Sequence, residues 1–373
     1  MNIGIVCYPT FGGSGIVATE LGHALAYKGH EVHFITYEQP VRLDIMHKRI
    51  FYHEVNVQAY PLFDYQPYEL ALSSQMVETV IARKLDILHV HYAIPHAYAA
   101  FMAKQILKGR GIDIGVVTTL HGTDITLVGR HPSYLPAVKF SIEQSDCVTA
   151  VSQSLKEDTI RNFKTEKKIH VIPNFIDMKL FTGKKACSGR LAADDEMLIS
   201  HISNFRAVKR TQDVITIFAG IREKMKAKLV LMGDGPDRDL ALKHAQDLGI
   251  EEDIKFLGKT NEVERVLCMS DLFLLPSSKE SFGLAALEAM AAKNPVISSK
   301  SGGLPELNVD GVTGFLSDVG DVESMIANSL KILENPEIKA EMSANALARA
   351  KEFDIELIVP LYEELYETVR SSN

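Results

Sequence analysis

The chain has 373 residues, 46% of them hydrophobic, so it can bury a sizeable core and fits two domains of ordinary size better than one. Its formal net charge is −8, and acidic and basic residues are interleaved, which leaves no basic face for nucleic acid or an anionic lipid surface. We therefore expect neither a nucleic-acid partner nor a membrane partner.

The beginning of the chain lacks the features of a secretory signal. Met1–Cys7 is an apolar, strand-like run without a basic start or a small-residue cleavage site. The stretch Ile87–Ala103, which is free of Asp, Glu, Lys and Arg, contains Pro95 and is shorter than the ~20 apolar residues of a spanning helix. The four cysteines show no C-x-x-C spacing typical of a metal knuckle or redox pair. We expect a cytoplasmic protein.

In the first half of the chain, apolar runs of strand length alternate with amphipathic stretches of helix length. This alternation is typical of a parallel sheet with helices on both faces, so the sequence predicts an α/β fold. A helix is predicted over Ile16–Lys28, and strands are predicted over Asn2–Cys7, Glu31–Thr36, Ile87–Tyr92, Gly115–Leu120 and Cys147–Val151.

A second series of the same kind follows a polar stretch, Thr182–Glu196, that has no clear periodicity. We expect one domain over residues 1–166 and another over residues 167–352. The second has predicted strands at Leu198–Ser203, Lys228–Met232, Asp253–Leu257, Leu272–Pro276 and Pro295–Ser299. In the last segment, residues 353–373, an apolar residue recurs every four positions and predicts a helix with one apolar stripe: Leu357, Leu361, Leu365 and Val369.

A glycine-rich segment, Gly12-Gly13-Ser14-Gly15, lies directly between the first strand and the first helix. Glycines let the backbone approach a ligand, and free N–H groups at a helix start favour phosphate. The same residues fit the G-x-G-x-x-G/A dinucleotide fingerprint, with Glu38 placed to bind a ribose hydroxyl. A NAD-dependent oxidoreductase is therefore an alternative, and so is a turn whose glycines serve only close packing.

Two carboxylates in the second half of the chain indicate the function more specifically than the glycine-rich segment does. Glu280 follows an apolar strand, and Glu288 lies eight residues later in a helix that is apolar nearly all round. A carboxylate buried there is costly unless it accepts hydrogen bonds, for which ribose hydroxyls are suitable donors. Backbone N–H groups at the start of this helix can face a diphosphate or a sugar. The predicted donor-binding segment comprises Ser281, Phe282, Gly283 and Leu284.

The E-x7-E spacing within ESFGLAALEAMAA resembles the signature of glycosyltransferase family 4 (GT4). The resemblance extends over nearly the whole chain through the GGSG loop and the segments HGTD (121–124), VIPN (171–174), GDGP (233–236) and GGLPE (302–306). It implies a GT-B fold, with two Rossmann-like domains facing each other across a cleft and a C-terminal helix crossing back to the first domain. An oxidoreductase would have no use for the E-x7-E helix.

The resemblance also implies roles for individual residues. Glu288 would bind the ribose of the nucleotide, and Glu280 would hold hydroxyls of the donor sugar. The GGSG loop, through Gly13, Ser14 and Gly15, would face the diphosphate. His121 would lie beside the donor sugar, near its 6-hydroxyl.

Two basic residues complete the implied catalytic set of His121, Glu280, Arg206 and Lys209. Lys209 matches the family's diphosphate lysine. The arginine usually found five residues earlier is replaced by Asn204. We expect Arg206 either to replace it on the diphosphate or to bind an anionic acceptor.

Four segments indicate which branch of the family the chain resembles: YPTFGGSG, HVHYAIPHA, TLHGTD and ISNFRAVKR. They resemble the branch of the family that transfers N-acetylglucosamine from UDP-GlcNAc to L-malate, the first step of bacillithiol biosynthesis. This implies retention at the anomeric carbon, release of UDP and no required metal. Malate has two carboxylates, so its site needs hydrogen-bond donors. The candidates are Tyr92, Thr119, His121, Asn174, Asn204 and Arg206.

Several alternatives remain at this stage. The acceptor could be another small molecule, or a lipid bound through a basic amphipathic surface helix. The stretch Arg42–Glu54 is a poor match to such a helix because it also holds Asp44. A non-catalytic sugar-binding relative and a homo-oligomer are also compatible with the sequence.

Overall fold

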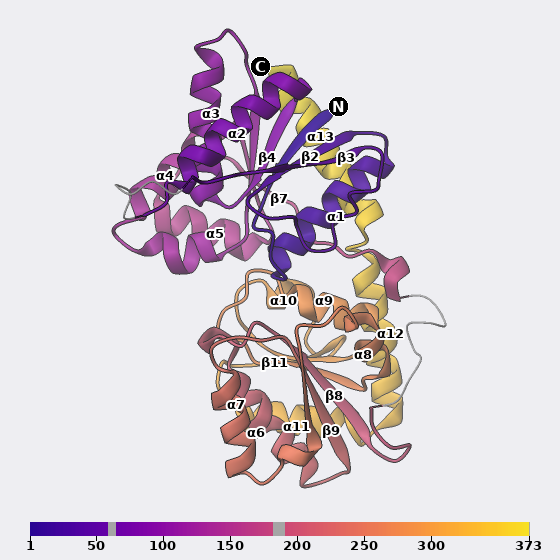
Figure 1. Ribbon diagram of the computed structural model, residues 1–373. Helices are drawn as coiled ribbons and strands as arrows, with labels where there is room; N and C mark the ends of the chain where they lie inside the picture. The colour runs from indigo at the N-terminus through magenta and orange to yellow at the C-terminus, as the bar shows by residue number, and fades with distance from the viewer. Residues whose placement is uncertain (59–64, 182–190, 373) are drawn as a thin grey trace. The chain divides into compact units, whose positions relative to one another are not determined.

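The computed structural model describes residues 1–58, 65–181 and 191–372 (Figure 1). The chain divides into two compact units, Met1–Asn174 with Ile355–Asn373, and Phe175–Asp354. The boundary lies after Asn174 rather than after residue 166, because the strand β7 (Ile169–Val171) pairs with β6 (Cys147–Ala150) in the first unit. The C-terminal helix belongs to the first unit, as expected.

Within its described residues, the first unit is a seven-stranded sheet with the order β3-β2-β1-β4-β5-β6-β7. Its remaining strands are β1 (Asn2–Val6), β2 (Glu31–Thr36), β3 (Ile50–Glu54), β4 (Ile87–His91) and β5 (Gly115–Leu120). Its helices are α1 (Gly13–Tyr27), α2 (Tyr68–Arg83), α3 (Tyr98–Lys108), α4 (Leu135–Gln144), α5 (Gln153–Phe163) and α13 (Ile355–Ser372). Short helical turns are η1 (Ala93–Ala97), η2 (Thr123–Leu127) and η3 (Val128–Arg130).

Alternate residues of these strands face opposite layers of helices. Val6 and Ile35 pack in one cluster with residues of α2 and α3. Their neighbours Ile5 and Phe34 lie within contact of Gly22 in α1, on the other face. Because successive side chains of a strand point to opposite faces, a strand buried on both faces is a continuous apolar run.

The second unit repeats this arrangement over its described residues. Its six-stranded sheet has the order β10-β9-β8-β11-β12-β13. The strands are β8 (Met197–Ile202), β9 (Ala227–Met232), β10 (Ile254–Gly258), β11 (Leu272–Leu275), β12 (Val296–Ser299) and β13 (Gly314–Ser317). The helices are α6 (Thr211–Arg222), α7 (Arg238–Asp247), α8 (Val263–Met269), α9 (Leu284–Ala291), α10 (Leu304–Leu307), α11 (Val322–Leu333) and α12 (Pro336–Lys351), with turns η4 (Met178–Phe181), η5 (Ala207–Lys209) and η6 (Glu251–Asp253).

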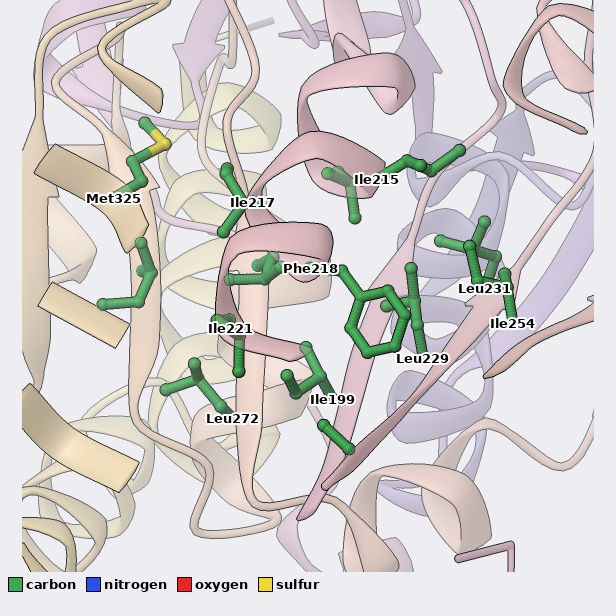
Figure 2. Packing of buried hydrophobic residues seen from close by; sticks show 14 of the residues in the cluster. Ile199, Ile215, Ile217, Phe218, Ile221, Leu229, Leu231, Ile254, Leu272 and Met325 are labelled. Carbon is green, nitrogen blue, oxygen red and sulfur yellow. The ribbon is translucent and has the colours of Figure 1, made fainter. Parts of the chain in front are cut away.

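The core of the second unit lies between this sheet and helices α6 and α11. Figure 2 shows Phe218 and Ile221 of α6 against Leu229 of β9 and Leu272 of β11, with Met325 of α11 nearby. All five side chains are fully buried. Full burial of such side chains stabilises a domain by about 1.5–3 kcal/mol each before conformational entropy is subtracted.

Every predicted strand is present, with ends within one residue of the prediction. The first helix, however, begins at Gly13 inside the glycine-rich segment, earlier than predicted. The stretch Arg42–Glu54 is not a surface helix, because it ends in strand β3, which pairs with β2.

Helix α13 packs against α1 and β5 with a face that differs from the predicted stripe. Leu357 and Leu361 are 58% and 39% exposed, whereas Tyr362 and Tyr366 are buried. A strict four-residue repeat drifts around a helix of 3.6 residues per turn, so the predicted stripe does not stay on one face. The buried face is Ile358, Val359, Tyr362, Leu365, Tyr366 and Val369.

Candidate active site

Both sheets have the doubly wound order, in which successive parallel strands are added first on one side of the first strand and then on its other side, with a switch point beside that strand. In the first unit this switch point lies between β1 and β4, and in the second between β8 and β11. Ligands of open α/β sheets bind at the carboxyl ends of strands at such points. Most of the predicted site residues lie at or after the ends of these strands or of β5, whereas Asn174 follows β7 at the edge of the first sheet.

The glycine-rich segment caps α1 at the end of β1. A Cβ on Gly15 would lie 2.6 Å from the carbonyl oxygens of Tyr8 and Thr10, so only glycine fits there. Packing therefore accounts for Gly15, whereas Ser14 is held by a side chain: the Tyr92 hydroxyl donates to its Oγ at 2.7 Å. Gly13 is the first residue of the helix, where backbone N–H groups have no intrahelical partner.

Tyr92 joins this loop to His121. Its ring centroid lies 5.1 Å from that of His121, and its backbone N–H donates to the carbonyl of Thr119 at 2.8 Å. Tyr92 has φ 84°, which costs free energy for a residue other than glycine and is typical of functional sites. The structure thus brings Ser14, Tyr92 and His121 together at the first switch point.

The buried carboxylate of Asp124, to which the sequence assigned no role, fixes the backbone next to Tyr92 and His121. Asp124 accepts hydrogen bonds from the backbone N–H groups of Ala93 at 2.9 Å and Gly122 at 3.0 Å. Burial raises the pKa of Asp124 to about 6, and these N–H donors partly oppose the rise. The signal available in the sequence was an Asp in the HGTD segment directly after an apolar strand.

Four histidines cluster behind Tyr92, on β4, η1 and the end of β5. Nδ1 of His91 lies 2.8 Å from Nε2 of His121, and Nδ1 of His96 donates to the carbonyl of His91 at 2.5 Å. Burial lowers the pKa of His89 and His121 to about 3, that of His96 to about 4, and that of His91 well below its usual value. These rings are neutral at physiological pH.

Thr119 does not have the acceptor-binding position that we expected. Its side chain is fully buried, and its hydroxyl pairs with Nε2 of His89 and with Oγ1 of Thr149, each at 2.7 Å. Nδ1 of His89 in turn pairs with the hydroxyl of Tyr366 at 2.7 Å. Thr119 therefore belongs to a polar network that holds helix α13 on the sheet.

Asn174 ends the first unit. It is 7% exposed, and its Oδ1 is buried without a hydrogen-bond partner among the residues that the structure describes. A buried amide oxygen of this kind normally finds a partner, so Asn174 remains a candidate for ligand binding.

In the second unit, Lys209 and Glu280, which the sequence analysis assigned to the diphosphate and to the donor sugar, form an ion pair. The two side chains are 19% and 13% exposed, and the Ser277 hydroxyl also donates to Oε1 of Glu280 at 3.3 Å. Ser278 donates its backbone N–H to the carbonyl of Val208 at 2.8 Å, which ties the loop after β11 to the turn after β8. The pair therefore sits at the second switch point.

Arg206 lies three residues before Lys209, and its side chain is exposed. Asn204 is also exposed, and Phe205 between them has φ 35° and is fully buried. A Cβ on Gly235 would lie 1.9 Å from the carbonyl oxygen of Asn204, which explains the glycine in the GDGP segment. The buried Phe205 leaves Asn204 and Arg206 on the surface of this turn.

The loop between β11 and α9 connects a strand to a helix, as the sequence predicts, but Glu288 is less buried than expected. Gly283 caps α9 with φ 99°, and Phe282 packs its ring edge against Phe353. Leu284 and Glu288, four residues apart, are half-buried on the same side of the helix. Ser281 is half-buried in this loop. The other faces of α9 are apolar and fully covered, so Glu288 faces the open side of an otherwise buried helix.

Comparisons with known proteins agree with this geometry. The model of the family "Glycosyltransferase Family 4" matches residues 11–180, and that of "Glycosyl transferases group 1" matches residues 188–349. An N-acetyl-alpha-D-glucosaminyl L-malate synthase from Bacillus anthracis is 47% identical over 99% of this chain and 97% of that protein. The chain belongs to glycosyltransferase family 4. The oxidoreductase alternative is therefore wrong.

Further relatives of this glycosyltransferase support its fold. An uncharacterized glycosyltransferase from Methanocaldococcus jannaschii is 30% identical over 86% of this chain and 89% of that protein. A crystal structure of Anabaena HepE with UDP and glucose has a TM-score of 0.82 at 21% identity, covering 98% of this chain and 99% of that one. A sucrose-phosphate synthase from Thermosynechococcus elongatus has a TM-score of 0.78 at 22% identity over 100% of both chains. These likenesses show the GT-B fold.

Among its described residues, the glycosyltransferase has no helix with the length and apolar character to cross a bilayer.

Proposed function

We propose that this glycosyltransferase transfers N-acetylglucosamine from UDP-GlcNAc to the hydroxyl of L-malate, with retention at the anomeric carbon. The products are GlcNAc-α-malate and UDP, the reaction belongs to bacillithiol biosynthesis in the cytoplasm, and it requires no metal. Identity of 47% to an N-acetyl-alpha-D-glucosaminyl L-malate synthase over nearly the whole chain supports the choice of donor and acceptor.

The observation that carries the proposal is the Lys209–Glu280 pair beside the start of α9. A lysine held by a carboxylate is positioned before the substrate arrives, and its charge favours a diphosphate leaving group. In the proposed complex Lys209 binds the diphosphate with Arg206, and Glu280 accepts hydrogen bonds from the donor sugar. Glu288 accepts them from the ribose, and the N–H groups from Ser281 to Leu284 face the phosphates.

The chemistry proposed for this site needs no protein nucleophile. The malate hydroxyl attacks from the face that UDP leaves, and the departing phosphate oxygen takes the hydroxyl proton. The enzyme's contribution is then positioning, together with stabilisation of the negative charge that develops on the diphosphate.

The acceptor site proposed here is smaller than the set expected from sequence. Tyr92, His121, Asn174, Asn204 and Arg206 remain candidates for binding malate, with Arg206 as the cation for one carboxylate. Thr119 is removed because its hydroxyl is already used by His89 and Thr149.

The proposal is tested by incubating the purified enzyme with UDP-GlcNAc and L-malate, following UDP release and identifying the product by mass spectrometry. We expect a product of the mass of GlcNAc-malate, an α-anomeric proton coupling in its NMR spectrum, and an unchanged rate with EDTA. D-Malate, UDP-glucose and a lipid acceptor serve as controls. No malate-dependent UDP release, or a faster reaction with a control substrate, contradicts the assignment.

A further inference from the structure

The contact between His91 and His121 determines which hydrogen-bond group His121 offers to a ligand. Nδ1 of His91 and Nε2 of His121 lie 2.8 Å apart, and one of the two must carry the proton between them. A neutral imidazole has a single N–H, so the direction of this hydrogen bond sets the tautomer of both rings. If His91 donates, His121 carries its N–H on Nδ1; if His121 donates, its Nδ1 is a bare lone pair.

The surroundings of His91 favour one direction. His91 is fully buried, and its Nε2 has no hydrogen-bond partner among the described residues. With the proton on Nε2, a buried N–H would be left without an acceptor. With the proton on Nδ1, the N–H is used and only a lone pair is unpaired, which folded proteins tolerate more often than an orphaned donor.

The neighbouring His96 already shows this arrangement. Its Nδ1 lies 2.5 Å from the carbonyl oxygen of His91, which can only accept, so Nδ1 of His96 carries the proton. Nε2 of His96 is then a buried lone pair without a partner among the described residues. The same interior therefore accommodates one such lone pair beside His91.

We propose that His91 is a positioning residue: it donates its Nδ1–H to Nε2 of His121 and holds His121 in the tautomer whose Nδ1–H donates to an oxygen atom of the bound substrate. His121 is suited to this because it lies at the carboxyl end of β5 and is only half-buried. Its Nδ1 has no partner within the part of the chain that the structure describes. The substrate part of the inference rests on the proposed function, whereas the tautomer does not.

The tautomer is tested first, on the complete wild-type protein labelled with 15N-histidine. The His121 signals are identified by their loss in His121→Gln. We expect Nδ1 of His121 at a protonated-nitrogen shift and Nε2 at a bare-nitrogen shift. The reverse pattern overturns the proposal, and the measurement needs neither substrate nor activity.

Variants of His91 then test its positioning role, with His33 as a matched control. His91→Asn keeps an N–H near the position of Nδ1, whereas His91→Phe removes it. His33 is likewise fully buried, pairs its Nδ1 with Nε2 of His53 at 2.9 Å and leaves its own Nε2 unpartnered among the described residues. His33→Phe therefore removes a buried histidine of the same sheet without touching His121.

We expect His91→Phe to convert His121 to a mixture of tautomers and to lower kcat for sugar transfer roughly 10-fold, less than the 10²–10³-fold loss from removing a donor itself. His91→Asn should keep the wild-type tautomer and most of kcat, and His33→Phe should leave the His121 signals unchanged. The proposal fails if His91→Phe leaves the tautomer unaltered or if His33→Phe alters it equally. If wild type transfers no sugar but shows the expected tautomer, only the proposed function fails.

Discussion

The two switch points of this enzyme are built from different chemistry. In the first unit, the histidines around Tyr92 are neutral; His91 and His121 hydrogen-bond to each other, and Tyr92 donates its hydroxyl to Ser14. In the second, the central contact is a lysine paired with a glutamate, and an arginine lies exposed nearby. The first arrangement offers directional hydrogen bonds, and the second offers charge that is suited to binding an anion.

This difference implies different sensitivities in the two units. Neutral buried histidines make the first unit sensitive to acid, because protonation there places a charge in the interior. The charged pair makes the second unit sensitive to substitutions that remove one partner.

The largest expected effect is acid destabilisation of the first unit. Burial lowers the folded pKa of His89 and His96 to about 3 and about 4, and that of His91 well below 6.5, so below pH 6.5 the unfolded chain binds more protons. Stability is then lost as pH falls, by about 2 kcal/mol per histidine at pH 5. Asp124 has a raised folded pKa of about 6, so it binds more protons when folded. Its protonation therefore offsets about 1 kcal/mol of this loss of stability. Burial also lowers the pKa of His33 and His121 to about 4 and about 3, so with five such histidines the first unit should lose about 9 kcal/mol in total.

Hydrogen exchange read by mass spectrometry at pH 7 and pH 5, corrected for intrinsic rates, tests this. The second unit has one buried histidine with a lowered pKa among its described residues, His201, and should lose only about 2 kcal/mol. Protection should therefore fall in β4 and β5 before β8 and β9. Equal loss in both units would show that the histidines do not make the difference.

Next in size is the effect of Lys209→Ala on turnover. The change removes the cation from the partly buried pair and leaves Glu280 without it, so transition-state stabilisation of the diphosphate should fall. We expect kcat for UDP release to drop roughly 10²–10³-fold, or about 2.7–4 kcal/mol. Lys226→Ala is the matched control, because Lys226 pairs with Asp195 on the surface of the same unit, with the side chains 71% and 63% exposed. Similar losses in the two variants would exclude a special role for Lys209.

Local patterns in the sequence predict most strands and the two carboxylates, but not the contacts between residues that are distant in sequence. The strands were found because those buried on both faces are continuous apolar runs, and β3, β7 and β13 were missed because their burial is mixed. Glu280 was found because its spacing to Glu288 is local. The pairing of His91 with His121 joins residues thirty positions apart on adjacent strands, and no local pattern records it. The burial of Glu288 was overestimated because apolar composition does not reveal which side of a helix stays uncovered.

A smaller effect is expected for Arg206→Ala. Because this side chain is exposed, its substitution should leave the fold intact and weaken only the binding of an anion. A charge-assisted hydrogen bond contributes about 1.5–3 kcal/mol, so we expect a roughly 10- to 100-fold loss in kcat/KM. A rise in the KM for malate alone assigns Arg206 to the acceptor, and a fall in kcat assigns it to the diphosphate. Unchanged kinetics for both substrates removes Arg206 from the site.

The smallest expected effect is a loss of stability from removing the hydrogen bond between Tyr366 and His89. The Lys209–Glu280 site is left unchanged. Tyr366→Phe removes the hydroxyl that pairs with Nδ1 of His89 at 2.7 Å and leaves that buried nitrogen without its partner. We expect the first unit to lose about 1–2 kcal/mol, seen as a lower urea midpoint with an unchanged slope. Turnover at low urea should stay at the wild-type value, because the hydroxyl holds helix α13 rather than substrate. Tyr27→Phe, at a side chain 73% exposed, should shift neither quantity. A wild-type midpoint for Tyr366→Phe would mean that apolar packing of α13, not the His89 hydrogen bond, keeps this helix on the sheet.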